Sequence, residues 1–244
     1  MESIRFDFNN MFKINIGDAN GVEDEDIAEI SAEIQRAHEH LARVTNDERS
    51  RIKLNLEWIK LPYQDENFIK DIQILGNEIA KKYENVISLG IGGSYLGLKA
   101  AQEALVSPYF NEFPGVRNKR PRIYFEGNNL DPDTLQALLQ NLNPKKTFVI
   151  VISKSGETIE TKAGLIIVEN WLKKSLGKNY LRQIFAITDP VSGSLRKRVN
   201  EEQKKDKLSF RNLPLLKGVG GRFSEFNMGL LHLAIIGIDI KKVL

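Results

Sequence analysis

The sequence of 244 residues contains no cysteine and only three histidines and three methionines. The absence of cysteine excludes a disulfide framework and any metal site built on thiolates. No apolar run is long enough to cross a bilayer, and the first residues have neither the basic flank nor the apolar core of a signal peptide. These absences favour a cytoplasmic protein without a membrane partner.

A strong excess of charge of one sign is also missing. The 35 basic and 32 acidic residues give a formal net charge of +3, and the one compact basic run, 118–122, leads into a predicted strand. A nucleic-acid surface would need a larger basic patch, so no nucleic-acid partner is expected. His38 and His40 are two residues apart on a predicted helix and do not share a face, so no metal site is expected there.

The most informative stretch runs from Thr147 to Gly164 and has three parts. Residues 147–152 are apolar and rich in β-branched side chains, which is typical of a central strand in a parallel sheet. A turn rich in hydroxyl groups follows, and then a helix. The turn therefore lies at the carboxyl end of a strand, where open α/β sheets bind ligands and helix N-termini favour anions.

This turn offers several groups that suit a phosphate. Ser153, Ser155 and Thr158 supply hydroxyl donors, Lys154 supplies a positive charge, and Gly156 allows close approach of the backbone. The alternative is an ordinary helix start, at which serine and threonine are favoured as N-caps. Because one cap needs only one hydroxyl, the residues predict a phosphate-binding turn.

Strands and helices alternate through the rest of the chain. The hydrophobic pattern predicts strands at 85–91, 122–126, 147–153, 183–188 and 208–213, with helices between them. This alternation predicts an α/β protein, a three-layer α/β/α sandwich with a five-stranded, mostly parallel sheet.

Two helical stretches precede the predicted sheet domain, one from about residue 22 to 44 and one from about 47 to 59. We therefore expect three parts in the chain. They are an α-helical N-terminal arm at 1–60, a ligand-binding domain at 61–212, and the start of a second, truncated domain at 213–244.

A second glycine loop, SLGIGGS at 88–94, follows the first predicted strand. It fails the dinucleotide pattern because Tyr95 takes the place of the last glycine, and it fails the P-loop pattern because Leu98 stands where lysine is required. A tight strand-to-helix turn remains, with Gly93 at its centre and Ser94 as the expected N-cap. If the first and third strands are neighbours, the two loops face each other across a topological switch point that fits a small phosphorylated ligand.

A third motif, GVGGRFS at 218–224, comes before a strongly apolar helix predicted at 228–238. The planar fork of Arg222 suits an anion or a developing oxyanion. The alternative is a flexible linker with a surface arginine. His232, inside the apolar helix, is expected to be a core histidine, and no later residues are available to cover this helix.

Three segments in this order, LGIGGSYLG, VISKSGETIET and GVGGRFSEFNMGLL, resemble the glucose-6-phosphate isomerase family. The likeness extends from about Leu54 to the end and includes GNNLDP and ITDPVSGSLR. The SKSGET turn alone is similar to the wider sugar isomerase (SIS) domain, which also occurs in amidotransferases and in sugar-phosphate-sensing regulators.

The resemblance implies a sheet of order 2-1-3-4-5, a hexose 6-phosphate as substrate, no cofactor, and a homodimer. It implies that Arg222 stabilises an enediolate formed when a proton moves between C1 and C2. Glu160 would orient a histidine that lies outside this chain. The remaining implied substrate contacts are Gly93, Ser94, Ser153, Lys154, Ser155, Thr158 and Gly221.

Members of this family are roughly twice as long, and their base, ring-opening histidine and a further lysine lie in a second domain. We therefore interpret the chain as an N-terminal half that binds the sugar phosphate but does not turn it over alone. The alternative is a stand-alone sugar-phosphate sensor. Such regulators carry a helix-turn-helix DNA reader, which the acidic helix start at residues 23–26 does not resemble.

Overall fold

The computed structural model describes residues 5–244, which form two compact units, one ending at Arg51 and the other spanning Ile52–Leu244. The first unit contains the short α1 (Lys13–Ile16) and the long α2 (Asp24–Asn46). A capping box starts α2, because Glu23 accepts from the N3 backbone while Asp26 accepts from the Glu23 N–H. α3 (Glu48–Leu54) begins in this unit and ends in the next.

A parallel five-stranded sheet in the order β2-β1-β3-β4-β5 forms the centre of the second unit. The predicted parallel sheet and its order are confirmed. β1 and β3 are neighbours, with Leu89 opposite Val151, so the loops that follow them leave the same edge. The strands are β1 (Asn85–Leu89), β2 (Arg122–Glu126), β3 (Thr147–Ile152), β4 (Ile184–Thr188) and β5 (Arg211–Pro214).

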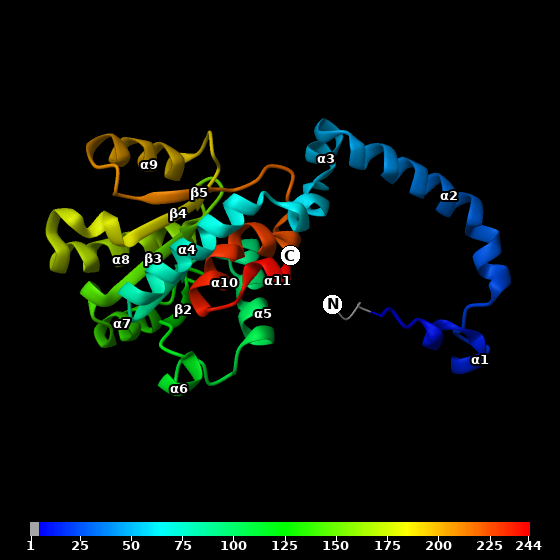
Figure 1. Cartoon of the computed structure of the whole chain (residues 1–244), viewed down its shortest axis with the longest axis horizontal. Coiled ribbons are helices and arrows are strands. Elements are labelled where there is room, and N and C mark those ends of the chain that lie inside the picture. Colours follow the sequence, from blue (N-terminus) through cyan, green and yellow to red (C-terminus); the bar gives the residue numbers. More distant parts are fainter. Residues whose placement is uncertain (1–4) are drawn as a thin grey trace. The chain divides into compact units, whose positions relative to one another are not determined.

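Helices cover both faces of this sheet and complete the predicted three layers (Figure 1). A hydrophobic core lies on each face of the sheet, and alternate residues of β3 point into one or the other. Phe148 and Ile150 belong to the first core, and Val149 and Val151 belong to the second. The first core contains α4 (Glu66–Lys82), α5 (Leu96–Leu105), α10 (Leu230–Ile236) and α11 (Ile240–Val243). The second contains α7 (Pro132–Asn141), α8 (Ile159–Leu176) and α9 (Ser194–Lys205). A short α6 (Pro114–Arg117) precedes β2.

No later segment was expected to cover the apolar helix near the end, and the structure covers this helix chiefly from earlier in the chain. Every residue of α10 is buried, and its main helical partner is α4, which lies more than 140 residues earlier in the chain. Gly76 of α4 faces Ala234, and the missing side chain lets the two helices approach closely. The predicted core position of His232 is confirmed, with 1% of its surface exposed.

Two local predictions also need correction. The helix expected at 47–59 is interrupted at Asn55, whose φ of 57° ends α3, and a 3-10 segment, Glu57–Tyr63, follows. Ser94 is not an N-cap: it closes a 3-10 turn, Gly92–Ser94, and Tyr95 caps α5 without a side-chain hydrogen bond. Within residues 5–244, no helix combines the length and apolar character needed to span a membrane.

Candidate functional site

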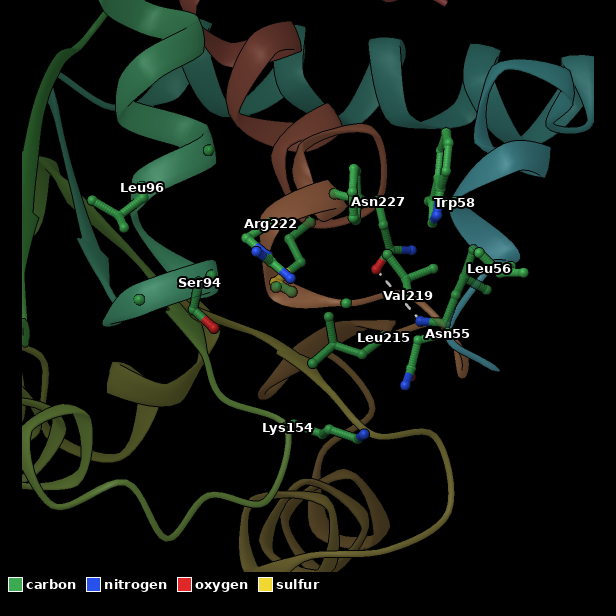
Figure 2. Close-up of a pocket in the computed structure, with 18 of the residues that line it drawn as sticks. Asn55, Leu56, Trp58, Ser94, Leu96, Lys154, Leu215, Val219, Arg222 and Asn227 are labelled. Carbon is green, nitrogen blue, oxygen red and sulfur yellow. Dashed lines mark hydrogen bonds between the residues drawn. The ribbon is translucent and has the colours of Figure 1, made fainter. Parts of the chain in front are cut away.

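A cavity of about 1130 Å³ opens beside the loops that follow β1, β3 and β5. Five glycines and five polar side chains contribute to its lining, and leucine, valine, methionine and aromatic residues form most of the remainder. In Figure 2, Ser94 and Arg222 lie on neighbouring loops, Lys154 comes from the loop after β3, and Asn55 and Trp58 lie on the far side.

The first glycine loop and the GVGGRFS loop touch backbone to backbone. A methyl group added to Gly93 would lie only 2.5 Å from the Gly221 Cα, so Gly93 has no room for a side chain, and one added to Gly221 would lie 3.2 Å from the Gly93 Cα. Ser224 is fully buried, and its Oγ lies 2.7 Å from the Gly93 carbonyl oxygen and 2.6 Å from the Gly221 carbonyl oxygen. Its single hydroxyl hydrogen can serve either carbonyl, which ties the two loops together.

Arg222 sits in a turn that is held from the other side as well. The N–H of Glu57 donates to the Gly218 carbonyl oxygen at 3.0 Å, and a β-bridge joins Leu56 to Val219. Next to Arg222, the Phe223 ring stacks on Trp58 with 4.7 Å between centroids. These contacts favour a fixed loop over the alternative of a flexible linker, and they place Arg222 at the cavity.

The turn after β3 has the form of an anion cradle. Ser153 Oγ accepts from the Gly156 N–H at 3.0 Å, and Ser155 Oγ accepts from the Glu157 N–H at 3.1 Å, so both hydroxyl hydrogens remain available to donate. Thr158 is the N-cap residue of α8 but makes no side-chain capping bond. The Thr158 hydroxyl therefore does not occupy the first-turn N–H groups of this 18-residue helix. Such uncapped N–H groups are the donors that an anion binds at a helix N-terminus.

The structure gathers some of the predicted site residues and leaves others beside the cavity. Gly93, Ser94, Lys154, Gly221 and Arg222 line it. The others, which do not line it, are Ser153, Ser155, Thr158 and Glu160. The Ser153 side chain is buried instead and lines a separate cavity of about 140 Å³ between α8 and α9.

Sequence reasoning missed several cavity residues. Asn55 and Trp58 come from the segment between α3 and α4, which the notable motifs do not touch. Asn227 also lines the cavity, and its side chain accepts from the Leu216 N–H at 3.4 Å. The one available signal was Asn55 itself, because asparagine tolerates a left-handed backbone better than most residues and often interrupts helices.

No aspartate, glutamate or histidine lines the cavity within the described part of the chain. The nearest candidate by sequence, Glu225, lies in a π-helical turn (Glu225–Gly229) directly after the Arg222 loop. Its carboxyl group is wedged against Gly229 and Gly97, and both oxygens are buried without a hydrogen-bond partner. Burial raises the pKa of Glu225 to about 7, so the group is largely protonated in mildly acidic solution.

A parallel sheet of this order, with a glycine loop after its first strand and a hydroxyl-rich turn after its third, defines an α/β protein of the sugar isomerase (SIS-like) class. Within that class, the chain belongs to the phosphoglucose isomerase family, whose model matches residues 63–243. The family resemblance seen in the motifs is thereby confirmed.

Three comparisons describe the family relationship. The glucose-6-phosphate isomerase of Carboxydothermus hydrogenoformans is 38% identical over 193 residues, which cover 79% of this chain and 40% of that protein. The glucose-6-phosphate isomerase of Acetivibrio thermocellus is 32% identical over 248 residues, covering 100% of this chain and 51% of that protein. A solved structure from Thermus thermophilus, described as a hypothetical protein, has a TM-score of 0.73 and 32% identity, covering 89% of this chain and 47% of its own. The chain spans about half the length of these proteins or less.

Proposed function

We propose that this chain forms the sugar-phosphate-binding half of a glucose-6-phosphate isomerase, which interconverts glucose 6-phosphate and fructose 6-phosphate. The turn after β3 would hold the phosphate through Ser153, Ser155 and Thr158, with Lys154 and the N-terminus of α8 adding positive potential. No cofactor is required, because the reaction moves a proton between C1 and C2.

The C1–C2 end of the sugar would extend from the phosphate toward Gly93, Ser94 and Gly221. Arg222 would stabilise the negative charge of the enediolate that forms during the proton transfer. One such preorganised donor typically lowers the barrier by about 3 kcal/mol. Glu160 keeps its proposed role of orienting a histidine from outside this chain.

One observation carries this proposal: Ser94, Lys154 and Arg222 line the same cavity although they come from three separate loops. The buried Ser224 hydroxyl fixes two of these loops to each other. A positive charge from the phosphate turn and a guanidinium from the opposite loop then face one space, which suits a ligand with a phosphate at one end and a developing oxyanion at the other.

In this proposal, the proton-transferring base and the ring-opening histidine lie in a second domain. This agrees with the cavity lining, which contains no acid or imidazole within the described chain, and with relatives about twice as long. Exposed apolar side chains beyond the carboxyl ends of the five strands, on the loops or at the first residue of the following helix, suit a domain that closes over the cavity. They are Leu96, Leu130, Ile159, Val191 and Leu216.

The same interpretation divides the chain into an arm at 1–60, a sugar isomerase domain at 61–212 and the beginning of the second domain at 213–244. It also includes a homodimer, a cytoplasmic location and a role in glycolysis.

A stand-alone sugar-phosphate-binding module is the second candidate function. The absence of an acid or imidazole among the cavity-lining residues of the described chain favours it.

The variant Ser155→Ala tests the phosphate assignment. It removes one hydroxyl donor to a phosphate dianion and should weaken binding of glucose 6-phosphate by about 1 to 3 kcal/mol, with nearly unchanged folding. Isothermal titration calorimetry gives the affinity, and urea unfolding gives the stability.

Ser31→Ala is the matched control, because Ser31 is an exposed hydroxyl on α2 outside the sheet domain. It should bind glucose 6-phosphate as the unaltered chain does. Equal affinity in Ser155→Ala and Ser31→Ala would disprove the assignment of Ser155 to the phosphate.

A further inference from the structure

The loop after β4 holds the carbonyl groups of the phosphate turn. The N–H of Asp189 and the hydroxyl of Thr188 both lie 3.3 Å from the Lys154 carbonyl oxygen. The N–H of Ser194 donates to the Ser155 carbonyl oxygen at 2.8 Å, and the Ser194 hydroxyl lies 3.3 Å from the same atom. Donors from residues 188–194, which run from the end of β4 to the first residue of α9, therefore reach two adjacent carbonyls of the turn after β3.

These contacts orient the amide groups of the turn. In a planar trans peptide, the carbonyl of one residue and the N–H of the next point in opposite directions. Anchoring the Lys154 carbonyl therefore turns the Ser155 N–H away from the β4 loop. Anchoring the Ser155 carbonyl directs the Gly156 N–H to Ser153 Oγ, as observed, and leaves the Ser153 hydroxyl hydrogen free for another acceptor.

Asp189 organises the loop that makes these contacts. Its Oδ1 accepts from the N–H groups of Val191 and Ser192, each at 2.8 Å, and lies 3.2 Å from the Ser192 hydroxyl. The N–H donors of Ser192 and Val191 lower the pKa of Asp189, so its carboxylate stays ionised at neutral pH. Arg196 anchors the same residue by donating from Nε to the Asp189 carbonyl oxygen at 2.7 Å.

The two loops also interlock at two glycines. A side chain at Gly193, where φ is 100°, would lie 2.6 Å from the Ser155 carbonyl oxygen. A side chain at Gly156, where φ is 78°, would lie 2.5 Å from the Leu195 N atom. Backbone thus packs on backbone in both directions, and a shift of one loop must move the other.

We propose that residues 188–194 form a clasp that sets the geometry of the phosphate turn, and that Asp189 is its positioning residue. The proposal rests on the function proposed above, because it assumes that the turn binds a phosphate. Asp189 does not touch the ligand. It acts through the backbone of the clasp, which holds Lys154 and Ser155 in the orientation that aims donors at the phosphate.

Three variants test the clasp by calorimetry with glucose 6-phosphate and with inorganic phosphate. Asp189→Ala removes the acceptor of three donors and should weaken binding of both ligands by roughly tenfold or more. Asp189→Asn keeps an acceptor oxygen and should restore affinity to within about threefold. Thr188→Val removes only one of the bonds to Lys154 and should cost roughly 2- to 10-fold.

Asp206→Ala is the matched control for a merely structural effect. Asp206 likewise accepts from a backbone N–H and a serine hydroxyl, those of Leu208 and Ser209, and it also pairs with Arg182. It lies between α9 and β5, before the amino end of β5, whereas the clasp follows the carboxyl end of β4. It should lower the free energy of unfolding without changing affinity, when all proteins are compared under conditions in which they are fully folded.

The possible results separate the two proposals. If the unaltered chain binds neither glucose 6-phosphate nor inorganic phosphate, the proposed function fails, and the clasp fails with it. If the unaltered chain binds but folded Asp189→Ala binds equally well, or loses no more affinity than Asp206→Ala, the clasp alone is overturned. The clasp is supported if the loss of affinity is largest in Asp189→Ala, intermediate in Thr188→Val and smallest in Asp189→Asn.

Discussion

Replacing His232 with leucine is expected to remove the main source of acid sensitivity identified in the sheet domain. The imidazole is 1% exposed, neither ring nitrogen has a hydrogen-bond partner, and burial lowers the pKa of His232 to about 3. Above pH 6.5, the side chain is neutral in both the folded and the unfolded state. As the pH falls from 6.5 toward 3, only the unfolded state gains the proton, so stability is lost.

The pKa difference from 6.5 to about 3 corresponds to at most about 5 kcal/mol of stability. His232→Leu should not show this loss, and at pH 7 it should gain roughly 1 to 3 kcal/mol because two unpaired buried nitrogens are removed. Urea unfolding at several pH values between 4 and 8 measures both effects. The exposed His38 provides the control, and His38→Gln should follow the unaltered chain. A His232→Leu curve parallel to that of the unaltered chain would contradict the assignment.

Replacing Glu225 with glutamine is expected to remove a loss of stability that occurs as the pH rises, whereas His232→Leu removes a loss that occurs as the pH falls. Both carboxyl oxygens are buried without partners, and burial raises the pKa of Glu225 from its ordinary 4.5 to about 7. Below pH 4.5, the group is protonated in both states, and its full contribution to stability is present. As the pH rises from 4.5 to 7, the unfolded state loses the proton first, and this contribution of roughly 3 kcal/mol is lost.

Glu225→Gln should therefore be more stable than the unaltered chain at pH 8, by up to about 3 kcal/mol, and nearly equal to it at pH 4.5. Glu78→Gln, which removes an exposed glutamate from α4, should show no such difference. Between pH 4.5 and 6.5, His232 and Glu225 have opposite effects on how stability changes with pH. His232→Leu should consequently lose stability as the pH rises through this window, and Glu225→Gln should lose it as the pH falls. Equal pH profiles for the two variants would refute this explanation.

The sheet was predictable because its strands carry a local signal. Residues 147–152 are buried on both faces, so they form a continuous apolar run, and each of the other strands is bounded by a turn or a helix start. The glycine and hydroxyl loops follow these strands directly. Their convergence at one edge then follows from the topology of a parallel sheet.

Contacts between distant segments were beyond the reach of sequence patterns. The apolar helix α10 is covered by α4, and the sequence of neither helix indicates that it packs against the other. The stacking of Trp58 on Phe223 and the bridge from Ser224 to Gly93 likewise join segments separated by more than 130 residues. The prediction of Ser94 as an N-cap failed for a local reason, because the chain turns once more before α5 begins.

The central claim is that this chain binds a hexose 6-phosphate through its phosphate group, and calorimetric titration of the unaltered chain tests it most directly. We expect saturable binding of glucose 6-phosphate and fructose 6-phosphate, weaker binding of inorganic phosphate, and no measurable binding of glucose, because the turn after β3 recognises the phosphate. Binding of glucose as tight as that of glucose 6-phosphate, or no binding of either sugar phosphate, would contradict the account.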